Sequence, residues 1–364
     1  MKKFNITCVI GTRPEALKMF PIIKALQADK LFSVCTIITG QHRELLAQLL
    51  KSLAINVTIN FDLMKSNQSL TALSAKLLQY FEAYFSKQPC DLLIAQGDTT
   101  TVLMAALSAF YKKIPFAHVE AGLRTKNISD PFPEEFNRRA ITLAATLHFC
   151  PTQSSANNLL KEGIQKNVFV TGNTIIDTLY AYLKKNSDDE KKSDKKLILV
   201  TCHRRENFGK PLLHICKALK KLAERNPEIE LLFPVHPNPN IKKVVEKQLS
   251  NIHNIKLSEP LDYEALVPVL QKAYLVLTDS GGLQEEAPAL NKPVLVLRNE
   301  TERPEGVACC AALLVGHDTN TIVQQVEKLL TDVTAYESMS RAVSPYGDGQ
   351  AAERIVHLIT QFFL

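Results

Sequence analysis

The sequence predicts an α/β protein with two domains, each built on a parallel sheet covered by helices. Three observations predict it. The 364 residues are too many for one ordinary core and suit two domains of about 150 to 200 residues each. Apolar residues make up 46% and charged residues 22%, as in ordinary globular proteins. Short apolar runs alternate with amphipathic stretches along the whole chain, which is typical of parallel sheets with helices on both faces.

The apolar runs define the expected strands in chain order. In the first half they lie at residues 4–10, 34–39, 92–95, 115–119, 147–150 and 168–171. In the second half they lie at residues 197–201, 231–235, 254–257, 275–278, 294–297 and 312–315. The run 184–196 between the halves holds six Lys and four acidic residues and no apolar residue, so we interpret it as a polar linker or a solvated loop. We therefore expect an N-terminal domain at 1–183 and a C-terminal domain at 197–348.

Charge and cysteine content exclude several classes of protein. The net charge of +6 is spread along the chain, whereas a nucleic-acid surface needs a clustered basic face. No apolar run approaches the ~20 residues of a membrane span. The first residues lack the apolar core and cleavage site of a secretion signal, so we expect a cytoplasmic protein. The eight cysteines form no C-x-x-C pair, which predicts buried thiols and neither a metal site nor disulfides.

Unusual polar clusters follow the predicted strands. They lie at residues 11–15, 96–98, 120–122, 203–207, 236–237 and 279–282. In open parallel sheets the ligand crevice lies outside the carboxyl ends of the strands. Two such sheets facing one another would bring all six clusters into one interdomain cleft.

Ser280, Gly281 and Gly282 precede a helical stretch at 283–290 and suit an anion. Glycines at a helix start let backbone N–H groups approach a phosphate, and the positive end of the helix dipole favours it. The alternative is that Ser280 only caps the helix. The chain has neither G-x-G-x-x-G after a strand nor a Walker A sequence, so dinucleotide oxidoreductases and P-loop proteins lose their main support.

Three cations, Arg13, Lys18 and Arg303, are candidates for neutralising a diphosphate. The guanidinium of an arginine can also bind a phosphate through two parallel hydrogen bonds. The alternative for each is an ordinary surface charge. His203 stands among two Arg and a Glu. It is either a solvated loop residue or a donor to a leaving phosphate.

Three carboxylates are candidates for moving protons. Acids gathered near a cleft and partly desolvated can have pKa values closer to neutrality, which suits general acid and base work. Asp98 could instead cap the helix that follows it, and Glu134 could be a first-turn acid favoured by the helix dipole. Glu120 has no capping role, and its alternative is an ion pair with Arg124.

Eight segments resemble the signatures of bacterial non-hydrolysing UDP-N-acetylglucosamine 2-epimerases. The similarity runs in order from about residue 4 to residue 349, nearly the whole chain. The segments are 11–15 (GTRPE), 40–42 (GQH), 97–101 (GDTTT), 118–125 (HVEAGLRT), 131–138 (PFPEEFNR), 203–207 (HRREN), 278–288 (TDSGGLQEEAP) and 301–305 (TERPE).

The resemblance implies a GT-B fold, in which two Rossmann-like domains with parallel sheets hold a nucleotide sugar in the interdomain cleft. It implies that the C-terminal helix, at 349–364, packs back on the first domain. The implied reaction interconverts UDP-GlcNAc and UDP-ManNAc by eliminating UDP to a 2-acetamidoglucal and adding it back. The family further implies a cytoplasmic homodimer that serves cell-surface polysaccharide synthesis and needs neither cofactor nor metal.

Roles for single residues follow from the same resemblance. It implies nucleotide-sugar contacts at Arg13, Lys18, His203, Ser280, Gly281, Gly282, Glu286 and Arg303, with Glu286 suited to the ribose hydroxyls, and uracil contacts at Leu261 and Leu266. It implies that Asp98, Glu120, Glu134 and His203 are catalytic, and it leaves open which carboxylate is acid and which is base. Gln41 and His42 match part of a second, regulatory UDP-GlcNAc site.

Three other functions were weighed. A hydrolysing epimerase would share the elimination but release UDP and free N-acetylmannosamine. A GT-B glycosyltransferase would need an acceptor groove, which no motif indicates. A non-catalytic nucleotide-sugar sensor would need no acid and base set, so the presence of three candidate carboxylates argues against it.

Overall fold

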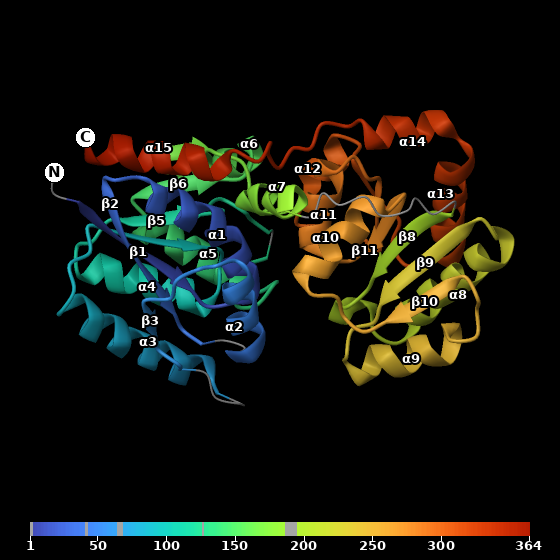
Figure 1. Cartoon of the computed structure of the whole chain (residues 1–364), viewed down its shortest axis with the longest axis horizontal. Coiled ribbons are helices and arrows are strands. Elements are labelled where there is room, and N and C mark those ends of the chain that lie inside the picture. Colours follow the sequence, from blue (N-terminus) through green and yellow to red (C-terminus); the bar gives the residue numbers. More distant parts are fainter. Residues whose placement is uncertain (1–2, 41–42, 64–67, 126, 186–194) are drawn as a thin grey trace. The chain divides into compact units, whose positions relative to one another are not determined.

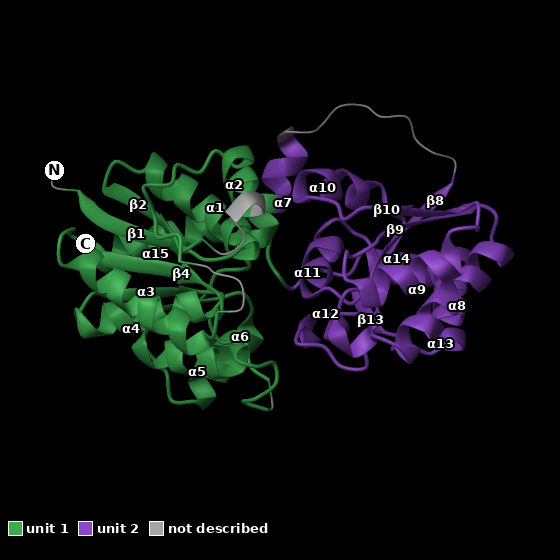
Figure 2. Ribbon diagram, turned by 90° about the horizontal axis from the view of Figure 1, so that it is seen from below, with its two compact units in different colours: residues 1–178, 346–364 green, residues 179–345 purple. Residues whose placement is uncertain are grey.

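A computed structural model describes residues 3–40, 43–63, 68–125, 127–185 and 195–364 (Figure 1). The chain forms two compact units (Figure 2). Unit 1 comprises Met1–Thr178 and Tyr346–Leu364, and unit 2 comprises Leu179–Pro345. The division falls inside helix α7 (Thr174–Lys185), whereas the expected boundary stood at 183/184, near the end of that helix.

Unit 1 is built on a sheet of seven parallel strands in the order β3-β2-β1-β4-β5-β6-β7. The strands are β1 (Phe4–Ile10), β2 (Phe32–Ile38), β3 (Ile59–Asn60), β4 (Leu92–Gln96), β5 (Phe116–Val119), β6 (Leu147–Cys150) and β7 (Val168–Val170). Its helices are α1 (Arg13–Ala28), α2 (Arg43–Ser52), α3 (Leu70–Phe85), α4 (Thr100–Tyr111), α5 (Glu134–Ala144), α6 (Gln153–Lys161), the first turn of α7, and α15 (Ala351–Phe363).

Helices cover both faces of this sheet. Right-handed crossovers place α1 and α2 on one face and α3, α4 and α5 on the other, where α3 packs on α4 and α4 on α5. The C-terminal helix α15 joins the first of these layers by packing against α1, and Phe363 stacks on Phe4 with ring centroids 4.2 Å apart. Its apolar side, which includes Ile355 and Ile359, is fully buried, so burial of this face holds the helix in unit 1.

Unit 2 is built on a sheet of six parallel strands in the order β10-β9-β8-β11-β12-β13. The strands are β8 (Lys196–Thr201), β9 (Ile229–Pro234), β10 (Ile255–Ser258), β11 (Leu275–Thr278), β12 (Val294–Val296) and β13 (Ala312–Leu314). The helical segments are η1 (Arg205–Asn207), α8 (Lys210–Arg225), α9 (Pro239–Leu249), α10 (Tyr263–Lys272), α11 (Gly281–Ala289), α12 (Pro304–Ala308), α13 (Thr319–Thr331) and α14 (Val333–Ser340). Helices α8, α9 and α13 pack together over one face, and α10, α11 and α12 belong to the other.

Each sheet has a point where the strand order reverses, and four of the six polar clusters lie there, whereas residues 120–122 and 236–237 follow the adjacent strands β5 and β9. In unit 1 this is the gap between the carboxyl ends of β1 and β4, and in unit 2 the gap between those of β8 and β11. Ligands of open parallel sheets bind at this point because the following loops diverge to opposite faces. Each unit thus carries its part of the predicted site at its own switch point.

The expected strands are all present, and the differences are local. The short strand β3 was not expected, since two residues give no periodicity. Helix α11 begins at Gly281 and α15 at Ala351, against expected starts at 283 and 349. All eight cysteines are free thiols, but the expectation that they are buried holds only for Cys8, Cys150, Cys202 and Cys216. Cys35, Cys90 and Cys309 are half-buried, and Cys310 is exposed in a turn with φ +62°. No helix in the described ranges combines the length and apolar character that a bilayer crossing requires.

Candidate active site

Asp98 follows β4 and is held by helix α5. Arg138 Nε donates to Asp98 Oδ2 at 2.8 Å, and Asn137 Nδ2 donates to the Asp98 carbonyl at 2.7 Å. The alternative role as a helix cap is wrong, because Thr99 caps α4. Burial raises the pKa of Asp98, the guanidinium of Arg138 opposes this, and the charges of Glu120 and Glu134 raise it further. Asp98 therefore lies close enough to Glu120 and Glu134 to be affected by their charges.

Glu120 follows β5, and its backbone has a φ of +64°, a conformation that residues other than glycine rarely adopt. Its carboxylate accepts hydrogen bonds from Lys18 Nζ at 2.6 and 2.8 Å, from Gln96 Nε2, and from Asn173 Nδ2 at 3.2 Å. The Lys18 and Glu120 side chains are 12% and 7% exposed. Donors to both oxygens and a buried ammonium favour the ionised carboxylate. Strained backbone held by its surroundings is typical of functional sites.

The ion pair considered as the alternative for Glu120 is therefore wrong. Arg124 instead pairs with Glu162, with a shortest distance of 2.7 Å, and also donates to the Thr142 hydroxyl. Lys18, expected at a diphosphate, lies against Glu120 in this structure. Arg13, at the start of α1, is half-buried and makes no ion pair with any described residue, so its guanidinium is available to an anion.

Glu134 and Glu135 are neighbours with different surroundings at the start of α5. Glu134 is half-buried and has no hydrogen-bond partner among the described residues. Glu135 is fully buried and accepts from Arg138, from Arg139 and from the backbone N–H of Thr125. Both residues lie in the first turn of α5, which agrees with the alternative role considered for Glu134. Of the two, Glu134 is the one whose carboxylate has no hydrogen-bond partner among the described residues.

The buried histidines of unit 1 belong to the core. His118 Nε2 lies 2.8 Å from the carbonyl oxygen of Gly97, and since that oxygen only accepts, Nε2 carries the proton. Burial lowers the pKa of His118 and of His148 to about 4. Both rings are therefore neutral at pH 7, and the His118 ring links β5 to the loop that follows β4.

In unit 2, Asp279 organises the loop that carries His203. Its fully buried carboxylate accepts from the backbone N–H groups of His203 and Arg204 at 2.8 Å each and from Asn207 Nδ2 at 2.9 Å. It also lies 3.2 Å from Nδ1 of His203, whose ring is 38% exposed. Burial lowers the pKa of His203, and Asp279 opposes this. The resting ring is neutral with its proton on Nδ1, so Nε2 accepts hydrogen bonds and donates only after protonation.

Ser280, Gly281 and Gly282 form the start of helix α11. Ser280 occupies the N-cap position, but its side chain makes no capping hydrogen bond, so the capping alternative is wrong in that respect. Glu286, one turn on, is 5% exposed and accepts from the Tyr263 hydroxyl at 2.6 Å. The side chain of Ser280 thus leaves the backbone N–H groups at the helix start uncapped, which suits an external anion.

A cluster of opposite charges lies beside this helix. Arg303 donates from Nε to Glu285, which is 1% exposed. Glu302 pairs with Arg298 at 2.5 Å and with Arg204 at 3.2 Å. Burial would raise the pKa of Glu302, but the charges of Arg303, Arg298 and Arg204 outweigh it and lower the pKa to about 2.. Arg303, expected to bind diphosphate, is thus partly committed to the protein itself.

The remaining predicted residues lie apart from these clusters. Leu266 is on α10 and packs against the apolar core under β11 and β12, and Leu261 precedes that helix and is half-buried. Gln41 and His42 lie outside the described residues.

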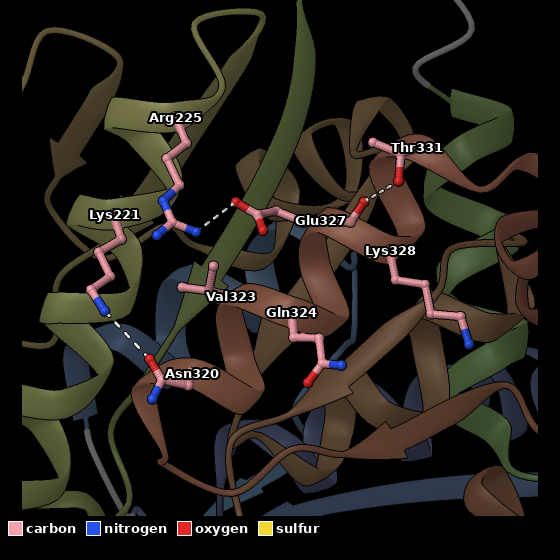
Figure 3. Close-up of a pocket in the computed structure, with 8 residues that line it drawn as sticks. All are labelled: Lys221, Arg225, Asn320, Val323, Gln324, Glu327, Lys328 and Thr331. Carbon is pink, nitrogen blue, oxygen red and sulfur yellow. Dashed lines mark hydrogen bonds and ion pairs between the residues drawn. The ribbon is translucent and has the colours of Figure 1, made fainter.

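A separate surface groove of about 450 Å³ lies between α8 and α13 (Figure 3). Two of its cations donate hydrogen bonds to other groove residues, Lys221 to Asn320 at 3.4 Å and Arg225 to Glu327 at 3.4 Å. It contains none of the predicted site residues, so we assign it no part in the site. The groove is lined by Lys221, Arg225, Asn320, Val323, Gln324, Glu327, Lys328 and Thr331.

Comparison with known proteins identifies the family. A family model described as UDP-N-acetylglucosamine 2-epimerase matches residues 24–360. The UDP-N-acetylglucosamine 2-epimerase of Campylobacter jejuni is 45% identical over 98% of this chain and 97% of its own length. This chain belongs to the UDP-N-acetylglucosamine 2-epimerase family.

Solved structures of the epimerase family agree with this assignment. The UDP-GlcNAc 2-epimerase from Neisseria meningitidis bound to UDP-GlcNAc is 41% identical, with a TM-score of 0.91 over 98% of this chain and 100% of that one. The enzyme from Methanocaldococcus jannaschii in complex with UDP-GlcNAc and UDP is 33% identical, with a TM-score of 0.83 over 98% of this chain and 100% of that one. The expected GT-B-type architecture of two Rossmann-like units with parallel sheets is confirmed.

Four residues that contact the candidate site residues were not selected as candidates from the sequence. Gln96 and Asp279 belong to the polar clusters at 96–98 and 279–282, so their position next to a strand end could have marked them as candidates. Arg138 and Asn173 gave no such signal, because their partners Asp98 and Glu120 lie 40 and 53 residues away in the chain.

Proposed function

We propose that this enzyme interconverts UDP-GlcNAc and UDP-ManNAc at sugar carbon 2 without hydrolysing them. UDP leaves carbon 1 as the proton leaves carbon 2, giving a 2-acetamidoglucal, and both then return with the proton on the opposite face. Each bond broken is formed again, so atoms and electrons balance without an oxidant or a reductant. Membership of the family and the ligands of the related structures support the nucleotide-sugar substrate.

The observation that carries the proposal is the contrast between two neighbouring acids of unit 1. Glu120 is bound through both oxygens by donors that include the ammonium of Lys18, which favours the ionised form. Burial and nearby negative charges raise the pKa of Asp98, so its carboxyl group holds a proton more readily than an exposed Asp does. Inversion at carbon 2 needs a group that takes a proton and a group that gives one. We assign the first task to Glu120 and the second to Asp98, with roles exchanged in the reverse direction.

The departing diphosphate is assigned to unit 2. The start of α11 offers backbone N–H groups without a capping side chain, and Arg204, Arg298 and Arg303 supply positive charge beside it. A diphosphate beside His203 would favour the imidazolium, so substrate binding itself would convert Nε2 into a donor. We assign the ribose to Glu286 on α11, whose carboxylate accepts a hydrogen bond from the hydroxyl of Tyr263 on α10.

Proton NMR of UDP-GlcNAc incubated with the enzyme in deuterium oxide tests the proposal. We expect UDP-ManNAc to form with deuterium at carbon 2 and no free sugar to accumulate. Asp98→Asn and Glu120→Gln should each lose most turnover while still binding UDP. Free N-acetylmannosamine and UDP as the main products would indicate the hydrolysing reaction instead, and full activity in both variants would remove these residues from the mechanism.

We further propose a homodimer that uses the outer surface of α4 and α5. Phe110, Tyr111 and Leu143 on these adjacent helices are 61%, 68% and 80% exposed, which is unusual for large apolar side chains. Sedimentation velocity should show a dimer for the parent and a monomer for Leu143→Arg.

A further inference from the structure

Asn173 begins the helix that leaves unit 1 and is almost completely buried, at 3% exposure. Its side-chain amide makes one hydrogen bond as an acceptor and one as a donor. Oδ1 accepts from the backbone N–H of Ile175 at 3.1 Å, which caps the first turn of α7, and Nδ2 donates to Glu120 Oε1 at 3.2 Å. One amide group therefore joins the start of this helix to the carboxylate assigned as the proton acceptor.

The backbone of Asn173 is held by the segment that returns to unit 1 near the C-terminus. Its N–H donates to the carbonyl of Tyr346 at 2.7 Å, and the Tyr346 side chain is 1% exposed. Gly172 and Gly347 lie backbone against backbone, so a Cβ on Gly347 would be 3.3 Å from Gly172 Cα. Both glycines have positive φ, at +90° and +125°, which other residues rarely adopt. The returning segment thus sets where Asn173 stands.

The strained backbone of Glu120 has to be held in place by the residues around it. Its φ of +64° leaves the backbone strained, and its carboxylate is bound by side chains from α1, β4 and the start of α7. Lys18 supplies charge to both oxygens, and Asn173 supplies a directional hydrogen bond to Oε1. Among the described residues, titratable groups that interact with Glu120 include Lys18 from α1, Asp98 after β4 and His118 from β5.

We propose that Asn173 is a positioning residue for Glu120, and that the Tyr346–Gly347 segment fixes Asn173 for this task. The amide orients the carboxylate and favours its ionised form, without touching the sugar. This inference rests on the proposed function, in which Glu120 takes the proton from carbon 2.

Asn173→Asp isolates the role of the amide. The aspartate keeps the oxygen that caps α7, so the helix retains its first-turn acceptor, but it replaces the donor to Glu120 with a second carboxylate. Two carboxylates at this distance share a proton. We expect UDP affinity within about twofold of the parent in the folded variant, and a fall in kcat of roughly ten- to a hundredfold, the scale for one hydrogen bond to a charged group. The acidic limb of the pH profile of kcat/KM should move to higher pH, further than in Asn173→Ala.

Asn158→Ala is the matched control. Asn158 also donates a side-chain amide hydrogen bond close to this loop, to the carbonyl of Gly122 at 3.0 Å, but it does not contact Glu120. Its pH profile should match that of the parent. An Asn173→Asp enzyme with the parent's kcat and pH profile would overturn the proposal, and so would an equal shift in Asn158→Ala.

Gly347→Ala tests the second part. The added Cβ would also lie 3.4 Å from the Asn173 nitrogen, so we expect the same shift of the acidic limb as in Asn173→Asp. Gly163→Ala controls for backbone strain, since Gly163 has φ +87° and nothing within 4 Å of its added Cβ. If Gly347→Ala does not fold, Gly172→Ala replaces it, with its Cβ at 3.4 Å from Gly347 Cα. An unshifted profile in the folded glycine variant would refute the role of the returning segment.

The parent and Glu120→Gln separate this inference from the proposed function. If the parent incorporates deuterium at carbon 2 and Glu120→Gln does not, the proposed function stands and the Asn173 variants decide the inference alone. If Glu120→Gln incorporates deuterium at the parent's rate, the proposed role of Glu120 fails first, and the inference fails with it.

Discussion

The carboxylate of Asp279 lies 3.2 Å from Nδ1 of His203 and accepts a hydrogen bond from the backbone N–H of the same residue at 2.8 Å. Asp279 follows β11 and His203 follows β8, and these strands are neighbours in the sheet. The sheet therefore delivers both residues to one place, and Asp279 determines both the course of the loop and the tautomer of the ring.

His203→Ala should slow epimerisation by about 10²–10³, the scale for removing one group that stabilises charge in the transition state. Asp279→Asn should also lower kcat, because its amide would present N–H groups to the backbone donors of His203 and Arg204. Steady-state kinetics with UDP titrations by calorimetry measure both. The exposed His253 supplies the control, and His253→Ala should behave like the parent. Near-normal turnover in His203→Ala would reject its role.

Glu134→Gln should lower turnover without changing stability, whereas Glu135→Gln should lower stability. Glu134 has no partner among the described residues, so its amide variant should fold with the parent's stability and lose most turnover. Glu135 is buried between two arginines and a backbone N–H. Breaking a buried charge pair costs about 3–5 kcal/mol, so Glu135→Gln should unfold at clearly lower urea concentration. Urea unfolding beside activity assays distinguishes them, and equal stability in the two variants would contradict this account.

Arg303→Met should lose stability as well as turnover. It leaves the buried carboxylate of Glu285 without the guanidinium, at a cost of about 3–5 kcal/mol in the free energy of unfolding. Adding Glu285→Gln should recover part of that stability but none of the turnover. Denaturant unfolding of the single and double variants measures this. A double variant that recovers activity would show that Arg303 acts only through folding.

Glu15 should make the stability depend on pH. It accepts from the backbone N–H groups of Gly11 and Thr12, yet its burial raises its pKa from 4.5 to about 7. Between these values the folded protein holds a proton that the unfolded chain has released, so the free energy of unfolding falls as pH rises from about 4.5 to 7. The shift corresponds to about 3 kcal/mol at 1.36 kcal/mol per pKa unit.

Glu15→Gln, which has no titrating group, should lack this contribution. The difference between its unfolding curves and the parent's isolates Glu15, because the buried His118, His148 and Asp177 titrate in both proteins. Urea unfolding at several pH values gives the comparison. A difference that stays constant from pH 4.5 to 7 would refute the assignment.

Much of the candidate site could be predicted from the sequence because parallel sheets place their functional loops by rule. Once residues 92–95 and 275–278 are recognised as strands, Asp98 and Ser280 must lie at carboxyl ends. Which groups pair there could not be predicted. Arg124 is near Glu120 in sequence, but Lys18, 102 residues away, takes the carboxylate. Sequence proximity is a weak guide at a loop, where the chain reverses and neighbouring side chains diverge.

The sequence by itself determined the alternation of strands and helices, the two units, the strand-end location of the motifs and the family, because apolar periodicity and local motifs are properties of short segments. Only the tertiary structure decided the protonation environment of the site. Asn173 contacts Glu120 through its side chain, and its backbone N–H donates to Tyr346, which lies 173 residues later in the chain. Electrostatics and hydrogen bonding act over a few ångströms in space, and a folded chain makes residues neighbours in space without making them neighbours in sequence.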